Sequence, residues 1–139
     1  MNKAELTLKI NQLKREIKEL ENSKAKRKKK IEANRGVLDE ATRSKRNFND
    51  RVAQSQRSLF NRLGNIEGSF SVFYKKQYND VLKKGDLDRA TMHLNDTIKK
   101  SKQAILKNEE EIASINRKID IKKRRLKEYQ KMLVNMKGN

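Results

Sequence analysis

The chain lacks several residues on which common protein architectures depend. Its 139 residues include no cysteine, no proline and no tryptophan, together with one histidine and five glycines. Without cysteine there are no disulfide bonds and no thiolate metal sites. The sequence therefore does not indicate whether the protein works in an oxidising or a reducing compartment. Without proline a long helix is favoured, because disordered chains are usually rich in proline whereas helix interiors exclude it.

Apolar residues are also scarce, and no apolar run approaches the roughly 18 residues of a membrane span. Hydrophobic residues make up 34% of the chain and charged residues 39%. This composition is typical of a disordered chain or a coiled coil rather than of a compact globule. Residues 1–5 lead directly into charged sequence, so no cleavable secretory signal is visible. We therefore expect a cytoplasmic location, with co-export alongside a partner as the alternative.

The spacing of the apolar residues decides in favour of helix. In both halves of the chain they alternate at intervals of four and three, the heptad pattern of a coiled-coil seam. The first seam consists of Leu6, Ile10, Leu13, Ile17, Leu20, Lys24, Arg27, Ile31, Asn34, Leu38, Ala41, Lys45, Phe48, Val52, Ser55 and Leu59. The second consists of Leu94, Ile98, Ser101, Ile105, Asn108, Ile112, Ile115, Ile119, Lys122, Leu126, Tyr129, Leu133 and Met136. The sequence therefore predicts an all-α fold with two long helices.

A pair of glycines four residues apart marks the expected chain reversal. Gly64 and Gly68 stand between the two seams, where glycine can end a helix and turn the chain. A tip at residues 63–68 leaves arms of nearly equal length, 3–62 and 69–136, so the two seams can meet along their whole length. The sequence therefore predicts a long antiparallel helical hairpin, packed as a coiled coil.

Gly85 offers an alternative position for the reversal, with Asp86 as a cap for the helix that follows. A reversal there would leave the seam of residues 6–20 without a partner in the same chain. We therefore predict one hairpin domain over residues 1–139, with its tip near 64–68 and a kink or break near Gly85.

The sequence gives little sign of catalysis. The only histidine, His93, lies near three aspartates, of which only Asp96 shares its helical face. We interpret these residues as a solvated helix start. No phosphate-binding loop, nucleophile elbow or zinc-protease motif is present. We therefore expect no enzymatic activity, no metal site and no cofactor.

Basic residues exceed acidic ones by 36 to 18, which gives a net charge of +18. Such a surplus attracts nucleic acid, anionic lipid or an acidic protein. The expected basic surface consists of Lys24, Lys26, Lys28, Lys29, Lys30, Lys123, Arg124 and Arg125. Three interpretations stay open: a solvated coiled-coil surface, a site for an acidic protein, and a nucleic-acid site. The third is weakened because the aromatic residues that would stack on bases lie elsewhere in the sequence.

Aromatic residues gather near the middle of the chain. Phe70, Phe73 and Tyr74 share one helical face, and Tyr78 follows one turn later. They either close the end of the hairpin core or form a docking surface, since aromatic side chains commonly anchor protein interfaces. We take these four residues as the candidate partner-binding site.

Several seam positions carry polar residues, which cost stability and can specify register or partner. They are Lys24, Arg27, Asn34, Lys45, Ser55, Ser101, Asn108 and Lys122. Two helices also leave half of each helix uncovered. We therefore expect another chain to complete the native state, as a homo-oligomer or a hetero-oligomer.

The layout resembles the small helical-hairpin proteins of Gram-positive type VII secretion, which have a Trp-x-Gly turn followed by small and aromatic residues. Residues 66–70, Ile-Glu-Gly-Ser-Phe, together with Phe73 match a degenerate form of that turn, with Ile66 in the Trp position. More specifically, the chain resembles the larger, Trp-less partner proteins encoded beside LXG toxins. That resemblance implies binding to the N-terminal helical domain of the toxin and its delivery to the secretion machinery.

The C-terminal export signal of those hairpin proteins, Tyr-x-x-x-Asp/Glu, is missing, because Tyr129 is followed four residues later by Leu133. This departure suits an accessory partner better than an independently exported protein. The leading prediction is thus a targeting or chaperone-like factor that binds a helical partner, one with an acidic surface. The alternatives are a coiled-coil stalk or adaptor of another assembly, such as a flagellar or type III export apparatus, and a basic coiled coil that binds nucleic acid.

Overall fold

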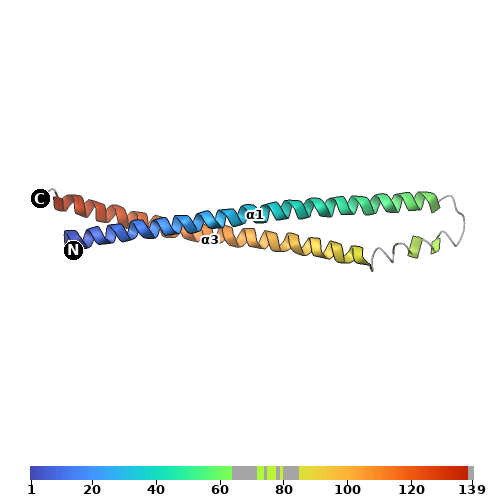
Figure 1. Cartoon of the computed structure of the whole chain (residues 1–139), viewed down its shortest axis with the longest axis horizontal. Helices are drawn as coiled ribbons and strands as arrows, with labels where there is room; N and C mark the ends of the chain where they lie inside the picture. Colours follow the sequence, from blue (N-terminus) through green and yellow to red (C-terminus); the bar gives the residue numbers. More distant parts are fainter. Residues whose placement is uncertain (64–71, 74, 78, 80–84, 138–139) are drawn as a thin grey trace. The chain divides into compact units, whose positions relative to one another are not determined.

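The computed structural model describes most of the chain as helix. The described residues are 1–63, 72–73, 75–77, 79 and 85–137. Two long helices account for nearly all of them: α1 spans Lys3–Leu63, and α3 spans Asp86–Lys137 (Figure 1). No strand occurs among these residues. The all-α prediction is therefore confirmed.

The start of α1 is fixed by a reciprocal capping arrangement. The backbone N–H of Glu5 donates to Asn2 Oδ1 at 2.8 Å, and the backbone N–H of Asn2 faces Glu5 Oε2 at 3.4 Å. These bonds satisfy donors that the first turn of a helix leaves without intrahelical partners. The carboxylate of Glu5 also complements the positive end of the helix dipole.

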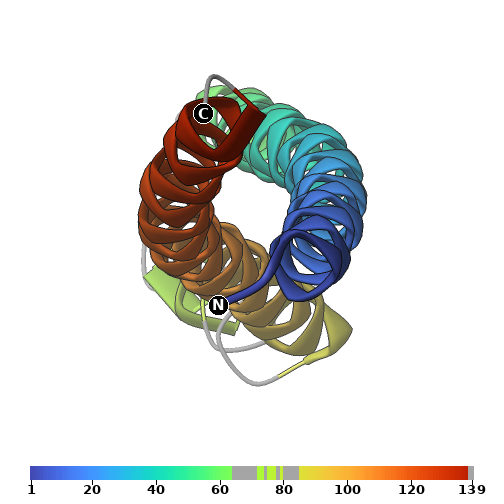
Figure 2. The same cartoon turned by 90° about the vertical axis from the view of Figure 1, so that its left-hand side faces the viewer.

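The chain falls into two compact units, each containing a part of α1 and a part of α3. Unit 1 comprises Met1–Ala33 and Ala104–Asn139, and unit 2 comprises Asn34–Gln103. In unit 1 the first part of α1 and the last part of α3 lie side by side and antiparallel (Figures 1 and 2).

The core of unit 1 is the predicted seam. Ile17 of α1 is buried together with Ile115 and Ile119 of α3, and Leu20 and Leu126 pack against them. Nearer to the start of α1 the seam residues Leu6, Ile10 and Leu13 are also buried. Burying such side chains supplies the main stabilisation of two helices that are otherwise largely polar.

The register between the two helices is constant along unit 1. Lys9 lies against Tyr129, Glu16 bonds to Lys122, and Arg27 pairs with Glu111. From Lys9 to Glu16 the chain advances seven residues in α1, and their partners step back seven residues in α3. From Glu16 to Arg27 both steps are eleven residues. A seam that keeps its heptad phase in both helices permits this regular pairing.

In unit 2 the two helices also pack against each other. Phe48 and Val52 of α1 line a shallow hollow of about 100 Å³ together with Leu87 and Thr91 of α3. Lys75 Nζ lies 5.5 Å from the centre of the Phe60 ring. In one continuous helix these two residues would be about 22 Å apart, so they do not belong to one straight helix.

The predicted hairpin is thus confirmed as the fold. α3 begins directly after Gly85, where the sequence predicts a kink or break, and its first turn includes a 3.2 Å bond from the Asp88 N–H to the Gly85 carbonyl. α1 covers the first predicted arm, 3–62, to within one residue. The proposed tip glycines, Gly64 and Gly68, lie outside the described residues.

The heptad pattern locates the packed face of both helices correctly. Of the first seam, every residue is buried or half-buried except Ser55, and of the second every residue except Met136. Within the part of the chain that the structure describes, no helix combines the length and apolar character needed to cross a membrane.

Candidate protein-docking site

A groove runs along one side of the seam in unit 1, with a volume of about 270 Å³. We call it the cationic groove. It is lined by Lys9, Gln12, Leu13, Glu16, Lys122, Arg125 and Tyr129. The first four come from successive turns of one side of α1, and the last three from one side of α3, because residues three, four and seven apart share a helical face.

A hydrogen-bonded network joins the two helices in the floor of the groove. Lys122 Nζ donates to Glu16 Oε2 at 2.6 Å, and Gln12 Nε2 donates to Glu16 Oε1 at 3.2 Å. The hydrogen bond from Lys122 lowers the pKa of Glu16, and the positive charges of Lys122 and Arg125 lower it further, against an opposing effect of desolvation. Glu16 is therefore ionised at neutral pH and offsets the charge of Lys122.

Two further cations stand at the rim of the groove. Lys9 Nζ lies 5.8 Å from the centre of the Tyr129 ring, a cation–π geometry, and both Lys9 and Arg125 are exposed. Among the described residues neither of them has a carboxylate within ion-pair distance. Leu13 is buried and Tyr129 is half-buried, so the groove combines a mainly polar lining and an excess of positive charge with a small apolar contribution from these two residues.

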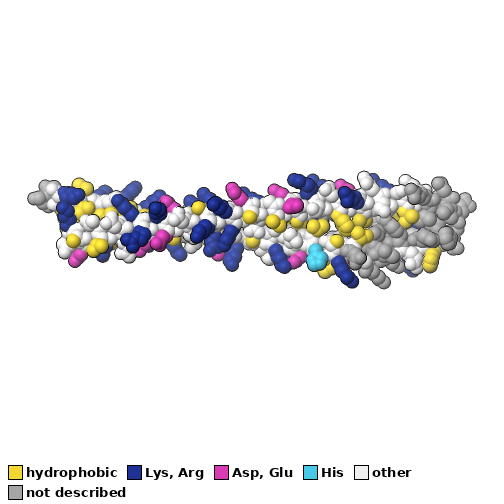
Figure 3. Space-filling model, viewed as in Figure 1, with side chains coloured by type: hydrophobic (Ala, Val, Ile, Leu, Met, Phe, Trp, Pro, Cys, Tyr) yellow, Lys and Arg dark blue, Asp and Glu magenta, His cyan; other side chains and the backbone are white. Residues whose placement is uncertain are grey.

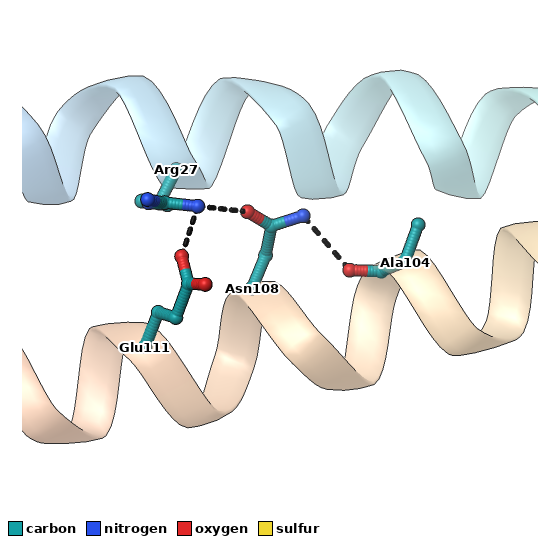
Figure 4. Close-up of polar contacts among 4 residues, drawn as sticks. All are labelled: Arg27, Ala104, Asn108 and Glu111. Atoms are coloured by element: carbon teal, nitrogen blue, oxygen red, sulfur yellow. Dashed lines mark hydrogen bonds and ion pairs between the residues drawn. The ribbon is translucent and has the colours of Figure 1, made fainter.

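A second polar layer crosses the seam elsewhere in unit 1. Figure 4 shows the Arg27 guanidinium reaching from α1 between two residues of α3, where it pairs with Glu111 and donates a 3.2 Å bond to Asn108 Oδ1. Asn108 Nδ2 in turn donates to the Ala104 carbonyl at 2.8 Å. Asn108 is buried, while the side chains of Arg27 and Glu111 are each 33% exposed. Both polar atoms of the Asn108 side chain therefore have hydrogen-bond partners, one across the seam and one along α3.

Most of the predicted basic residues lie on the surface. Lys24 is half-buried at the seam. The exposed members are Lys26, Lys28, Lys29, Lys30, Lys123, Arg124 and Arg125. Figure 3 shows Lys and Arg side chains over much of the visible surface of the described helices, with acidic side chains between them. Of these residues, Arg125 belongs to the cationic groove, and Lys123 Nζ approaches Glu21 at 3.9 Å.

The predicted aromatic site is described only at Phe73. Its side chain is 57% exposed, and that of the neighbouring Val72 is 68% exposed. An exposed aromatic residue beside an exposed aliphatic one is compatible with a docking surface. Phe70, Tyr74 and Tyr78 lie outside the described residues, so the grouping of the four residues stays a prediction.

The remaining polar residues singled out in the sequence form no cluster. His93 is exposed, and Asp96 pairs with Lys100 at 3.0 Å one turn further along α3. Among the described residues no three His, Asp or Glu side chains converge in a way that would hold a metal ion.

The cationic groove itself was missed by the sequence interpretation. No sequence pattern marks Lys9 and Gln12, because neither belongs to a basic run or to the seam. The sequence pattern assigns Tyr129 only to the seam. The available signal was the position of Lys9 and Glu16 beside the seam, seven residues apart, where flanking residues of one helix meet those of the other.

No protein-family model, curated protein sequence or solved structure matches the chain. The resemblance to type VII secretion partners therefore stays a prediction from the sequence.

Proposed function

We propose that this protein is a non-enzymatic adaptor whose helical hairpin binds a helix of another protein. The observation that carries the proposal is a row of seam residues on α3 that two helices cover only in part. Within unit 1 this row comprises Ile105, Ile112, Leu126 and Leu133, all half-buried, whereas Ile119 of the same row is buried.

Exposed apolar residues extend this row at both of its ends. Leu106 follows Ile105 and is 57% exposed, and Val134 follows Leu133 and is 67% exposed. The two are four heptads apart and thus share one face of α3. We call Ile105, Leu106, Ile112, Leu126, Leu133 and Val134 the apolar edge.

The shape of the surface supports a helical ligand. Val134 forms part of an open hollow of about 380 Å³ with Lys127, Gln130, Lys131 and Asn135, which succeed one another on one face of α3. A partner helix lying along α3 would remove the apolar edge from water, which favours binding in proportion to the apolar area covered. A third or fourth helix is the usual way in which helical bundles complete such a core.

The resemblance of the sequence to partners of LXG toxins suggests one specific form of this function. In that form the protein acts in the cytoplasm as a targeting or chaperone-like factor. Its ligand is the N-terminal helical domain of a toxin that it helps to deliver for type VII secretion. The hairpin fold and the incompletely covered seam support this proposal.

The test is co-expression with the N-terminal helical domain of an LXG toxin, followed by size-exclusion chromatography with light scattering. We expect a stable complex for the native chain and a weaker one for the double substitution Leu106→Gln/Val134→Gln. The matched control is Leu8→Gln, because Leu8 is 69% exposed on the side of α1 away from the seam. The proposal fails if no complex forms, or if the control weakens the complex as much as the double substitution does.

A further inference from the structure

The cationic groove and the apolar edge lie on opposite sides of the same seam. On α3 the groove is lined by Lys122, Arg125 and Tyr129. Successive residues are rotated by about 100° around a helix. On this basis Val134 of the apolar edge and the three groove residues lie on opposite sides of Leu126. A helix that covers one side therefore leaves the other accessible.

We propose that the cationic groove is a second docking site, which binds an acidic helical segment of a protein through carboxylates spaced one helical turn apart. This inference goes beyond the proposed function, because an adaptor with two such sites can hold two helices at once. The choice of an acidic occupant rests on charge. The groove has three cations and one carboxylate, and that carboxylate is already bonded to Lys122.

The spacing of the two rim cations defines the acidic pattern. Lys9 lies against Tyr129, and Arg125 precedes Tyr129 by four residues, so the backbone positions that carry the two cations are about one turn, roughly 6 Å, apart along the groove. Carboxylates at positions i and i+4 of a helix have the same separation. An Arg–carboxylate pair and a Lys–carboxylate pair can therefore form together.

The apolar part of the lining favours a helix with an apolar residue between its acids. Leu13 is buried and Tyr129 is half-buried, and the Tyr129 ring is in contact with the cation of Lys9. Amphipathic tyrosine and arginine side chains are those on which protein interfaces most often depend. A leucine next to the acidic pair would contact the Tyr129 ring while the carboxylates reach the rim.

The probe for this site is a fluorescein-labelled helical peptide of about 20 residues, a length that sustains a helix. It carries Glu pairs at i and i+4 with adjacent Leu. A second peptide replaces every Glu by Gln. Fluorescence anisotropy with the full chain at about 0.15 M salt, where exposed charges are screened beyond about 8 Å, should show binding of the Glu peptide. We expect the Gln peptide to bind at least about tenfold more weakly, the equivalent of about 1.4 kcal/mol.

Two double substitutions separate a specific groove from general attraction to a basic protein. Lys9→Gln/Arg125→Gln should weaken binding of the Glu peptide about tenfold, while circular dichroism shows unchanged helix content. Lys29→Gln/Arg124→Gln removes the same charge from exposed positions outside the groove and should change binding less than about twofold. Leu106→Gln/Val134→Gln should leave peptide binding unchanged, since it alters the other side of the seam.

Three results would overturn the inference. The first is absence of binding by the Glu peptide, and the second is equal weakening by the two charge substitutions. The third is a DNA duplex that binds more tightly than the peptide and loses affinity with Lys9→Gln/Arg125→Gln, which would assign the groove to nucleic acid. None of these bears on the complex with the co-expressed helical protein, so this site and the adaptor function can fail separately.

Discussion

Lys122 donates a 2.6 Å hydrogen bond to Glu16 from a seam position at which a two-stranded coiled coil normally has an aliphatic residue. The bond crosses from α3 to α1 and closes the floor of the cationic groove. The polar residue is therefore accommodated by a partner on the facing helix, and the pair has measurable consequences for stability.

The first prediction concerns the stability of the fold at acidic pH. The pKa of Glu16 is lowered in the folded state from its ordinary value of 4.5, chiefly by the hydrogen bond from Lys122. A carboxyl group with a lowered folded pKa stabilises the fold above its unfolded pKa, and this contribution is lost as pH falls through the folded value. Urea unfolding at a series of pH values should thus show falling stability below pH 4.5. Glu16→Gln should make that fall shallower.

Glu21→Gln provides the control for this measurement. Glu21 approaches Lys123 only to 3.9 Å, and both side chains are 54% exposed, so screening by water leaves the pair little to contribute. If both substitutions flatten the pH dependence equally, the effect belongs to the net charge of the protein and not to the Glu16–Lys122 bond.

The second prediction compares two isoleucines two residues apart in α3. Ile119 is 6% exposed in the core of unit 1, whereas Ile121 is 50% exposed. Ile119→Ala should lower the free energy of unfolding by about 2–4 kcal/mol, because it removes buried methyl groups and leaves a cavity. Ile121→Ala should change it by less than about 0.5 kcal/mol. Denaturation followed by circular dichroism measures both, and equal losses would show that the seam is misplaced.

The third prediction concerns how much the buried polar residue Asn108 lowers the free energy of unfolding. Asn108→Leu should raise the free energy of unfolding by about 1 kcal/mol, because a buried polar seam residue is exchanged for an aliphatic one while Arg27 keeps Glu111 as a partner. Asn22→Leu, at an exposed position of α1, should have little effect. A loss of stability in Asn108→Leu would mean instead that the Arg27–Asn108 bond stabilises the hairpin.

The fourth prediction concerns the start of α1. Asn2→Ala removes the acceptor of the Glu5 N–H and should destabilise the first turn by about 1 kcal/mol. Asn2→Ser retains an acceptor and should restore most of the loss. Hydrogen exchange of the amides of residues 5 and 6 is the appropriate measurement, because fraying of one turn leaves the melting temperature nearly unchanged.

The seam could be predicted residue by residue because heptad spacing depends on sequence alone. Ile17 and Ile119 were each assigned correctly to the packed face, and so were Arg27 and Asn108. That Arg27 meets Asn108 was not predicted, since it depends on the register of one helix against the other. A shift of one turn would give each polar residue a different neighbour.

The candidate site was harder to predict for the same reason. Lys9 and Arg125 are far apart in sequence, and nothing local distinguishes them from the many other cations of the chain. They become neighbours in one groove only because the antiparallel packing places Tyr129 beside Lys9. Phe73 could be selected from its helical spacing to the neighbouring aromatic residues, and its exposure agrees with a docking role.

The constant register of unit 1 limits how this protein can change in length during evolution. A single residue inserted between Lys9 and Glu16 would rotate one end of α1 by about 100° relative to the other. Lys9 would then leave Tyr129, or Glu16 would leave Lys122. A whole heptad inserted in α1 restores the rotation but shifts every later partner unless α3 gains a heptad at the facing position. We therefore expect homologues to differ here by paired insertions or deletions of seven residues.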